Sequence, residues 1–159
     1  MAERLTVKDV MVKDVISVHP DTSILQAQQL LSEHRLDGMP VVDFENRLIG
    51  VITEYDLLAR GSSVHLPTLQ KLFAELPVYK KNYNDFKKEI YELSKLTVRD
   101  IMNKEPLTLS PSASLQDMVE MFREHHRVNP IPVVDKDQKV VGVVSRYDAV
   151  KLFYVIKIT

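Results

Sequence analysis

The segment GVITEYD, residues 50–56, decides the fold, because a closely similar segment, GVVSRYD, returns at residues 142–148. In both, a glycine and two apolar residues precede a hydroxyl side chain, and an aspartate follows three positions after the hydroxyl. Three other pairs of segments repeat in the same order: VKDVM (7–11) and VRDIM (98–102), SVHP (17–20) and TLSP (108–111), PVVD (40–43) and PVVD (132–135). Four matched blocks in order indicate an internal duplication, so the chain consists of two related copies.

The distance between equivalent residues changes once along this duplication. Val7 and Val98 are 91 residues apart, whereas Gly50 and Gly142 are 92 residues apart. One residue is therefore inserted in the second copy between Pro111 and Pro132, and we expect it in the loop near residues 128–130.

Each copy has the local pattern of a short leading helix followed by a β-α-β-β-α unit. Thr6 and Thr97 are suitable N-caps for the leading helices, and residues 15–18 predict a first strand. Apolar residues three and four positions apart then predict an amphipathic helix that begins near Ile24. Two short apolar segments separated by a polar turn predict a β-hairpin, and the last helix of the first copy is expected to begin at Thr53.

One unit of about 60 residues buries too little apolar surface to be comfortably stable alone. We therefore predict an α/β (α+β) fold in which two β-α-β-β-α units pack through their sheets about a pseudo-twofold axis. The expected boundaries are residues 1–60 for the first domain, 61–95 for a helical insert and 96–159 for the second domain.

The insert contains two helical patterns of apolar and aromatic side chains. The first consists of Leu66, Leu69, Leu72, Phe73 and Leu76, and the second, after Pro77, consists of Tyr79, Tyr83, Phe86 and Ile90. Such a stripe packs against its own module, covers a cleft or forms a dimer contact, and the sequence leaves these alternatives open.

The composition argues against several classes of function. A net charge of −1 gives no bulk attraction to nucleic acid or anionic lipid, and the absence of cysteine excludes disulfides, thiol catalysis and cysteine–zinc sites. The N-terminal residues lack the apolar region of a signal peptide, and no stretch approaches the ~18 consecutive apolar residues of a membrane span. We therefore expect a cytoplasmic protein with neither nucleic acid nor membrane as a partner.

The repeated aspartates are the main candidates for binding chemistry. Asp56 follows Thr53 by three residues at the start of a helix, and Asp148 follows Ser145 in the same way. Such a carboxylate can accept hydrogen bonds from both hydroxyls of a ribose, while the hydroxyl side chain and the helix N-terminus can hold a phosphate or sugar oxygen. The same residues also suit an ordinary N-cap with an acid in the first helical turn, so both interpretations stay open.

The ordered blocks resemble the CBS domain family, named after cystathionine beta-synthase, in its tandem form, the Bateman module. The likeness covers residues ~5–60 and ~96–153. This resemblance implies a regulatory module without catalytic residues, in which the cleft between paired domains binds an adenosine compound such as AMP, ADP, ATP or S-adenosylmethionine. It also implies a homodimer and an effector protein that responds to the ligand, and it requires no cofactor.

By the same resemblance, the adenine ring lies between two backbone segments of one copy. These segments are Val15-Ile16 and Leu36-Asp37-Gly38-Met39-Pro40 in the first copy, and Pro106-Leu107 and Val128-Asn129-Pro130-Ile131-Pro132 in the second. Gly38 lets a ring approach the backbone closely, whereas Pro130 at the matching position is bulkier. We therefore expect the two sites to differ.

Charged side chains distinguish the two sites further. Arg146 lies within the second block, where we expect it near a phosphate, whereas Glu54 at the matching position would repel one. Further basic candidates precede the Pro-Val-Val-Asp strands: Arg35, His126 and Arg127. We expect the Asp148 site to favour phosphorylated ligands, and the Asp56 site to bind a less charged adenosine compound or to stay empty.

Two other functions compete with the sensor. The first is a structural dimerisation or interaction module with degenerate, empty sites, which Glu54 and Pro130 favour. The second is an enzyme, which is the weaker interpretation because the sequence shows neither a nucleophile–base pair nor a set of metal ligands. Residues 124–126, Glu-His-His, resemble a metal-site fragment, but no second cluster accompanies them, and we expect His125 at a helix end near the last carbonyl groups.

Overall fold

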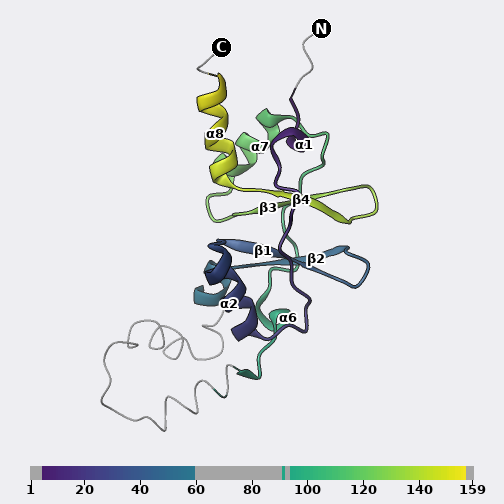
Figure 1. Ribbon diagram of the computed structural model, residues 1–159, viewed down its shortest axis with the longest axis vertical. Coiled ribbons are helices and arrows are strands. Elements are labelled where there is room, and N and C mark those ends of the chain that lie inside the picture. Colours follow the sequence, from purple (N-terminus) through teal and green to yellow (C-terminus); the bar gives the residue numbers. More distant parts are fainter. Residues whose placement is uncertain (1–4, 60–90, 92–93, 157–159) are drawn as a thin grey trace, which may run out of the picture.

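The computed structural model describes residues 5–59, 91 and 94–156. Its two halves are stacked along the long axis, with a two-stranded antiparallel sheet from each half at the centre and the helices on the outer sides (Figure 1). The predicted α/β architecture of two units packed through their sheets is confirmed. The helical patterns expected between residues 66 and 90 lie outside the described residues.

The first half contains α2 (Ile24–His34), β1 (Gly38–Val42), β2 (Leu48–Thr53) and α3 (Glu54–Ala59). Helix α2 begins after Ser23, whose hydroxyl accepts a hydrogen bond from the backbone N–H of Gln26 at 3.2 Å. The predicted apolar face of α2 is buried at Ile24, Ala27 and Leu31. Because Oγ of Ser23 satisfies one of the unpaired N–H groups of the first turn, the helix starts at a defined residue.

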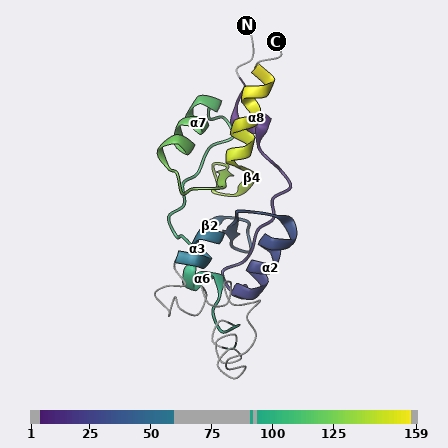
Figure 2. The same ribbon diagram turned by 90° about the vertical axis from the view of Figure 1, so that its left-hand side faces the viewer.

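The second half repeats this order with α7 (Leu115–Glu124), β3 (Ile131–Val134), β4 (Val140–Val144) and α8 (Arg146–Ile156). Met118 and Phe122 bury the inner face of α7. Figure 2 shows α7 and α8 on the outer side of their sheet, opposite α2 and α3 in the other half. The two hairpin turns carry a residue with positive φ at equivalent positions, Asn46 (φ 64°) and Gln138 (φ 62°).

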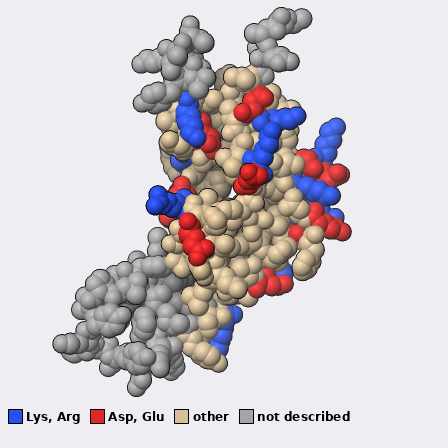
Figure 3. Space-filling view, in the orientation of Figure 1, with Lys and Arg blue, Asp and Glu red and all other residues tan. Residues whose placement is uncertain are grey.

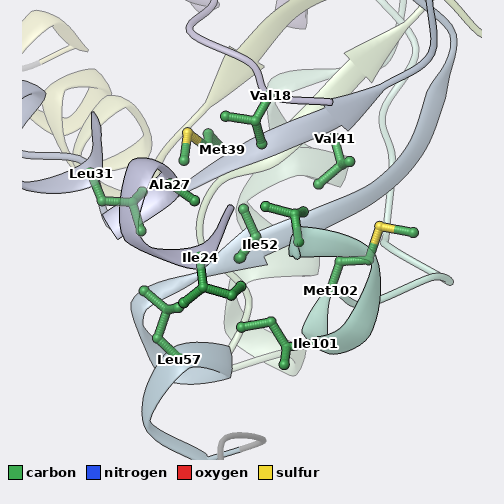
Figure 4. Close-up of a cluster of buried hydrophobic side chains, with 11 residues drawn as sticks. Val18, Ile24, Ala27, Leu31, Met39, Val41, Ile52, Leu57, Ile101 and Met102 are labelled. Atoms are coloured by element: carbon green, nitrogen blue, oxygen red, sulfur yellow. The ribbon is translucent and has the colours of Figure 1, made fainter. Parts of the chain in front are cut away.

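The leading helices are exchanged between the halves. Helix α1 (Val7–Val10) precedes the first half in sequence, but Val7 is buried in the core of the second half. Helix α6 (Val98–Ile101) precedes the second half, but its Val98 and Ile101, and the following Met102, are buried in the core of the first half, where Figure 4 shows Ile101 and Met102 among Ile24 and Ile52. In Figure 1, α1 lies beside α7, and α6 beside α2. Neither packed half is therefore one continuous segment of the chain.

Two glycines allow the exchanged segments to approach the strands. A Cβ atom on Gly50 in β2 would lie 2.8 Å from the backbone oxygen of Asn103 and 2.8 Å from Met102 Sδ. A Cβ atom on Gly142 in β4 would lie 2.5 Å from Met11 Sδ. The same segments pair by backbone hydrogen bonds, Val51 with Asn103 and Val143 with Val12. The glycine of each repeated block therefore meets the methionine that follows the leading helix of the other copy.

The two sheets contact each other through a small apolar cluster and through the ends of the hairpins. Val42, Val134 and Val140 are buried in this cluster. The backbone N–H of Leu48 donates to the carbonyl of Gln138 at 2.9 Å, and the N–H of Val140 donates to the carbonyl of Asn46 at 3.0 Å. These bonds join the two hairpins and set how the halves are placed against each other.

One local prediction was wrong. Residues 15–18 do not form a strand, because only Val18 pairs, in a single parallel bridge with Val41. The inserted residue lies in the predicted loop between α7 and β3: α2 ends tightly at Arg35, which has a left-handed φ of 52°, whereas α7 ends at Glu124 and residues 125–127 form the wider connection. Within the described ranges, no helix is both long and apolar enough to cross a membrane.

Candidate ligand pocket between the halves

Asp56 and Asp148 occupy equivalent places at the starts of α3 and α8. Asp56 Oδ2 accepts hydrogen bonds from the backbone N–H and the hydroxyl of Thr53, at 3.0 and 2.8 Å. Asp148 Oδ2 accepts the corresponding bonds from Ser145, at 2.8 and 2.7 Å. The exposed fractions of the two aspartates are only 6% and 8%. The capping interpretation is therefore confirmed for both pairs, and it uses one oxygen atom of each carboxylate.

A pocket of about 190 Å³ opens beside Thr53 and Asp56, and its walls come from both halves. Pro106, Leu107 and residues 127–130 line it from the second copy. The predicted adenine segments of the second copy therefore lie together in one pocket, and the aspartate beside them is Asp56 of the first copy. The reason is the exchanged helix: the chain crosses from α6 back to its own half along residues 103–109 and passes β2 on the way.

Among the described residues that line this pocket, Arg127 is the one lysine or arginine. Its Nη1 donates a hydrogen bond to the hydroxyl of Tyr55 at 2.9 Å, and its guanidinium carbon lies 5.4 Å from the centre of the Tyr55 ring. The carboxylates of Asp56 and Glu105 are the negative charges of the lining. Arg127 and Tyr55 come from different halves, so their contact closes one side of the pocket across the interface.

The Arg146 guanidinium is bonded to the C-terminal end of α7, whereas we expected it near a phosphate. Its Nη1 donates to the carbonyl of Phe122 at 2.9 Å, and its Nη2 donates to the carbonyl of His125 at 2.6 Å. The guanidinium also lies over the Phe122 ring, 5.4 Å from its centre. The extra residue after α7 leaves these terminal carbonyls open, and a cation at the C-terminal end of a helix is electrostatically favourable. His125 is the C-cap of α7, as predicted.

Glu54 and Arg35 line a different pocket, of about 470 Å³, between α2 and α3. Glu54 is not among the residues that line the pocket beside Asp56. The predicted repulsion of a phosphate by Glu54 at that aspartate is therefore not supported by the geometry. Glu54 and Arg146, which occupy equivalent positions in the repeated blocks, both lie beside the helix that precedes their own hairpin.

Gly38 and Pro130 meet each other across the two halves. A Cβ atom on Gly38 would lie 3.0 Å from Pro130 Cδ and 2.9 Å from the carbonyl oxygen of Ile52. The ring that approaches Gly38 is therefore the proline of the other copy, whereas we expected a ligand. Next to this contact, Asn129 Nδ2 donates to Asp37 Oδ2 at 2.5 Å. These two equivalent pairs mark the pseudo-twofold axis between the halves.

The other residues predicted to surround adenine are placed in the cores or beside them. Met39 and Ile131 are completely buried, and Pro40 and Pro132 are among the fully buried side chains. Val15 packs against the central cluster, and Ile16 against the core of the first half. None of these six residues lines the pocket beside Asp56.

Sequence reasoning missed four residues that line the pocket: Val51, Tyr55, Asn103 and Glu105. Asn103 and Glu105 lie just after a leading helix, and no motif marks them. Tyr55 had a signal that we did not use, because a tyrosine recurs at Tyr147 in the second block. Within the described residues, no group of three or more histidine, aspartate or glutamate side chains could hold a metal ion.

Comparison with known proteins identifies the class. The chain matches the CBS domain over residues 7–63 and again over residues 98–154. These two matches cover more than half of the chain, and the structure has the two packed units of a CBS pair. The chain belongs to the CBS domain family, as a tandem pair with the Bateman module fold.

The chain is similar to particular CBS-pair proteins. It is 34% identical to the chloroplastic CBS domain-containing protein CBSX1 of Arabidopsis thaliana over 155 residues, which are 96% of this chain and 65% of that relative. The solved structure of CBSX2 in complex with AMP has a TM-score of 0.72 and 31% identity, covering 96% of this chain and 98% of the other. The CBS domain pair of protein MJ0100, in complex with 5′-methylthioadenosine and S-adenosyl-L-methionine, has a TM-score of 0.67 and 25% identity, covering 94% and 96%.

The chain thus spans about two thirds of the length of the curated relative CBSX1. The relatives named above are CBS-pair proteins, and two of the solved pairs hold an adenosine compound. A ligand-binding regulatory module is the class of protein that these similarities support.

Proposed function

We propose that this CBS pair binds an adenosine compound in the pocket between its halves and signals the binding by a change in their spacing. The observation that carries the proposal is that Thr53 and Asp56 share one pocket with the apolar segments at Pro106–Leu107 and Val128–Pro130. The first half supplies the polar start of α3, and the second half supplies the apolar side chains. AMP and S-adenosylmethionine complexes of similar pairs support this ligand class.

The pocket residues suggest a role for each part of the ligand. The adenine ring lies between Pro106–Leu107 and Val128–Pro130, where apolar walls leave backbone groups to read the base edge. The ribose hydroxyls donate to the Asp56 carboxylate, whose Oδ2 is already fixed by Thr53. The Arg127 guanidinium now donates to the neutral Tyr55 hydroxyl. When the ligand binds, it donates to a phosphate in a stronger, charge-assisted hydrogen bond.

The position of Arg127 favours a phosphorylated ligand at the Asp56 pocket, the reverse of our expectation from sequence. Arg127 lines this pocket, whereas Arg146 is bonded to the carbonyl groups at the end of α7. The residue equivalent to Asn129 in the other copy is Asp37, so the corresponding site beside Asp148 would have a carboxylate in place of an amide. A further negative charge disfavours a phosphate there, so the Asp148 site is the one that takes a less charged compound or stays empty.

The size of the pocket supports signalling by movement. Its volume of about 190 Å³ is smaller than the ~300–1,000 Å³ typical of small-molecule sites. A nucleotide therefore enters by separating the halves or by opening the contact between Tyr55 and Arg127. A ligand that prefers the separated state shifts the population toward it, and an effector protein or a second copy in a homodimer reads the change.

The alternative is a structural interaction module whose pockets stay closed. One specific observation favours it: Gly38 packs against Pro130, and Asp37 binds Asn129, so the centre of the interface is already filled by protein. In this case no nucleotide would bind, and the pair would serve only to associate with a partner.

A thermal-shift screen separates the two functions. Purified protein is heated with AMP, ADP, ATP, S-adenosylmethionine, NAD or GTP. A ligand at ~100 times its Kd that binds only the folded state adds about 2.7 kcal/mol, which raises the Tm of a protein of this size by about 5–10 °C. We expect a rise with AMP and none with GTP. No rise with any adenosine compound, in protein that melts cooperatively, would reject the sensor and favour the structural module.

A further inference from the structure

Residues that line the pocket between α2 and α3 have equivalents in the other half of the protein. Glu54 and Leu31 line this pocket of about 470 Å³. Their equivalents in the second copy are Arg146 and Phe122, which contact each other: the Arg146 guanidinium lies over the Phe122 ring and donates to the Phe122 carbonyl. At equivalent places beside the two helices, the second half holds the Arg146 guanidinium and the first half has a pocket.

The substitution of Glu54 for Arg146 changes both the filling and the charge of this place beside the helix. In the second half, the Arg146 guanidinium satisfies two terminal carbonyl groups of α7. In the first half, the exposed Glu54 side chain forms no hydrogen bond or ion pair with any described residue. The C-terminal end of α2 lies at the same pocket, but the carbonyl groups of Leu31 and Ser32 already accept hydrogen bonds from the backbone N–H of Arg35, so the Glu54 carboxylate is the acceptor that this half offers. The first half therefore presents a carboxylate where the second half has its own cation.

The chemistry of the lining fits a guanidinium compound. The charges of the lining are Asp37, Glu54 and Arg35, so one carboxylate remains in excess. Leu31, Leu36 and Leu57 supply an apolar floor for an alkyl stem. The volume lies within the ~300–1,000 Å³ usual for small-molecule sites. A carboxylate above an apolar floor is the complement of an arginine side chain, which combines a planar charged head with an apolar stem.

We propose that the pocket between α2 and α3 binds the guanidinium group of an arginine, in the place that Arg146 fills in the other half. This site is distinct from the pocket at Asp56 and does not depend on the function proposed for it. The shared chemistry is the guanidinium with its alkyl stem, either in free arginine or in an arginine residue of a polypeptide. Glu54 pairs with the guanidinium, and Leu31 and Leu57 contact the stem.

The test is an NMR titration of the full-length ¹⁵N-labelled protein with N-acetyl-L-arginine N-methylamide, which mimics an arginine residue. The citrulline analogue is the matched control, because it has nearly the same shape and no charge. We expect saturable shifts at Leu31, Glu54 and Leu57, and an affinity at least about tenfold higher for the arginine compound, as a charge-assisted pair implies. Free L-arginine forms a separate arm, and stronger binding of it than of the mimic would identify a free amino acid as the ligand.

Variants of Glu54 complete the test. Glu54→Gln should weaken binding about tenfold, and Glu54→Arg should abolish it by filling the pocket as Arg146 does. Glu33→Gln is the matched control, since Glu33 is exposed on the same helix and bonded to Gln29 outside the pocket. Equal binding of the citrulline analogue, unchanged affinity in Glu54→Gln, an equal loss in Glu33→Gln, or no shifts at all would overturn the proposal.

Discussion

The exchange of the leading helices makes a quantitative prediction about Met11. The Cβ atom of an alanine at position 142 would lie 2.5 Å from Met11 Sδ and 2.9 Å from its Cγ, well inside the ~3.5–4.0 Å at which carbon atoms pack. The next atom, the backbone oxygen of Val12, is 3.1 Å away. The Met11 side chain therefore causes most of the collision, and its removal should relieve most of the cost.

The expected changes in the free energy of unfolding follow from this geometry. Gly142→Ala alone should cost about 1–3 kcal/mol, the usual effect of overpacking. Met11→Ala alone should cost about 1–2 kcal/mol, less than the ~2–5 kcal/mol of a fully buried methionine, because Met11 is only half-buried. The double variant should lose about 1–2 kcal/mol less than the sum of the two, because it contains no collision.

Urea unfolding measures all three variants, with equal m-values as the check that only stability has changed. The matched control is Met11→Ala combined with Gly50→Ala. Gly50 contacts Met102 and Asn103, so these two changes should add within about 0.5 kcal/mol. Additive effects of Met11 with Gly142, or coupling of Met11 with Gly50, would show that the leading helix packs on its own copy and would refute the exchange.

Three further predictions concern the pocket and the hairpin turns. Arg127→Gln should lower the affinity for AMP about tenfold and leave that for adenosine unchanged; calorimetry that shows equal losses for both would remove Arg127 from the phosphate position. Gln138→Gly should raise the free energy of unfolding by about 0.5–1 kcal/mol, since the left-handed φ of 62° strains any residue with a Cβ; Gln138→Ala should give no gain, and a gain from both would point to another cause. Hydrogen bonds from the backbone N–H of Arg47, and from its side chain, lower the pKa of Asp43 in the folded protein. The ionised carboxylate therefore stabilises the fold at a pH above the pKa of Asp43 in the unfolded chain. This stabilisation is lost as the pH falls through the lower pKa of the folded protein. Urea midpoints of wild type and Asp43→Asn should therefore converge below about pH 4, and a constant difference between them would contradict this.

The local structure was predictable because it depends on residues close in sequence. The apolar face of α2 and the hairpins follow from spacings of two to four residues, whereas the N-cap of α2, Ser23, was not predicted. The duplication also predicted two packed units, because neither copy has enough apolar surface by itself. The helix face can be recognised within a window of about 11–18 residues, whereas the duplication requires segments 91 and 92 residues apart to be compared.

The exchange was not predictable from the same patterns. The apolar residues of α1 and α6 indicate that these helices are buried, but not in which core, since the two copies have nearly equivalent cores. This choice also decides which aspartate shares a pocket with Pro106–Leu107, and the sequence patterns do not show that it is Asp56. The inserted residue had a further effect, because it opened the end of α7 and drew Arg146 away from the position expected for a phosphate.

A calorimetric titration of AMP into a matched pair of variants tests the central claim most directly. Asp56→Asn and Asp148→Asn both keep an oxygen for the helix cap, but each loses the charge and the second acceptor that a ribose needs. We expect Asp56→Asn to lower the affinity for AMP at least about tenfold, and Asp148→Asn to change it less than about twofold. Equal losses, or a loss only in Asp148→Asn, would contradict the assignment of the ligand to the pocket that Thr53 and Asp56 share with the other half.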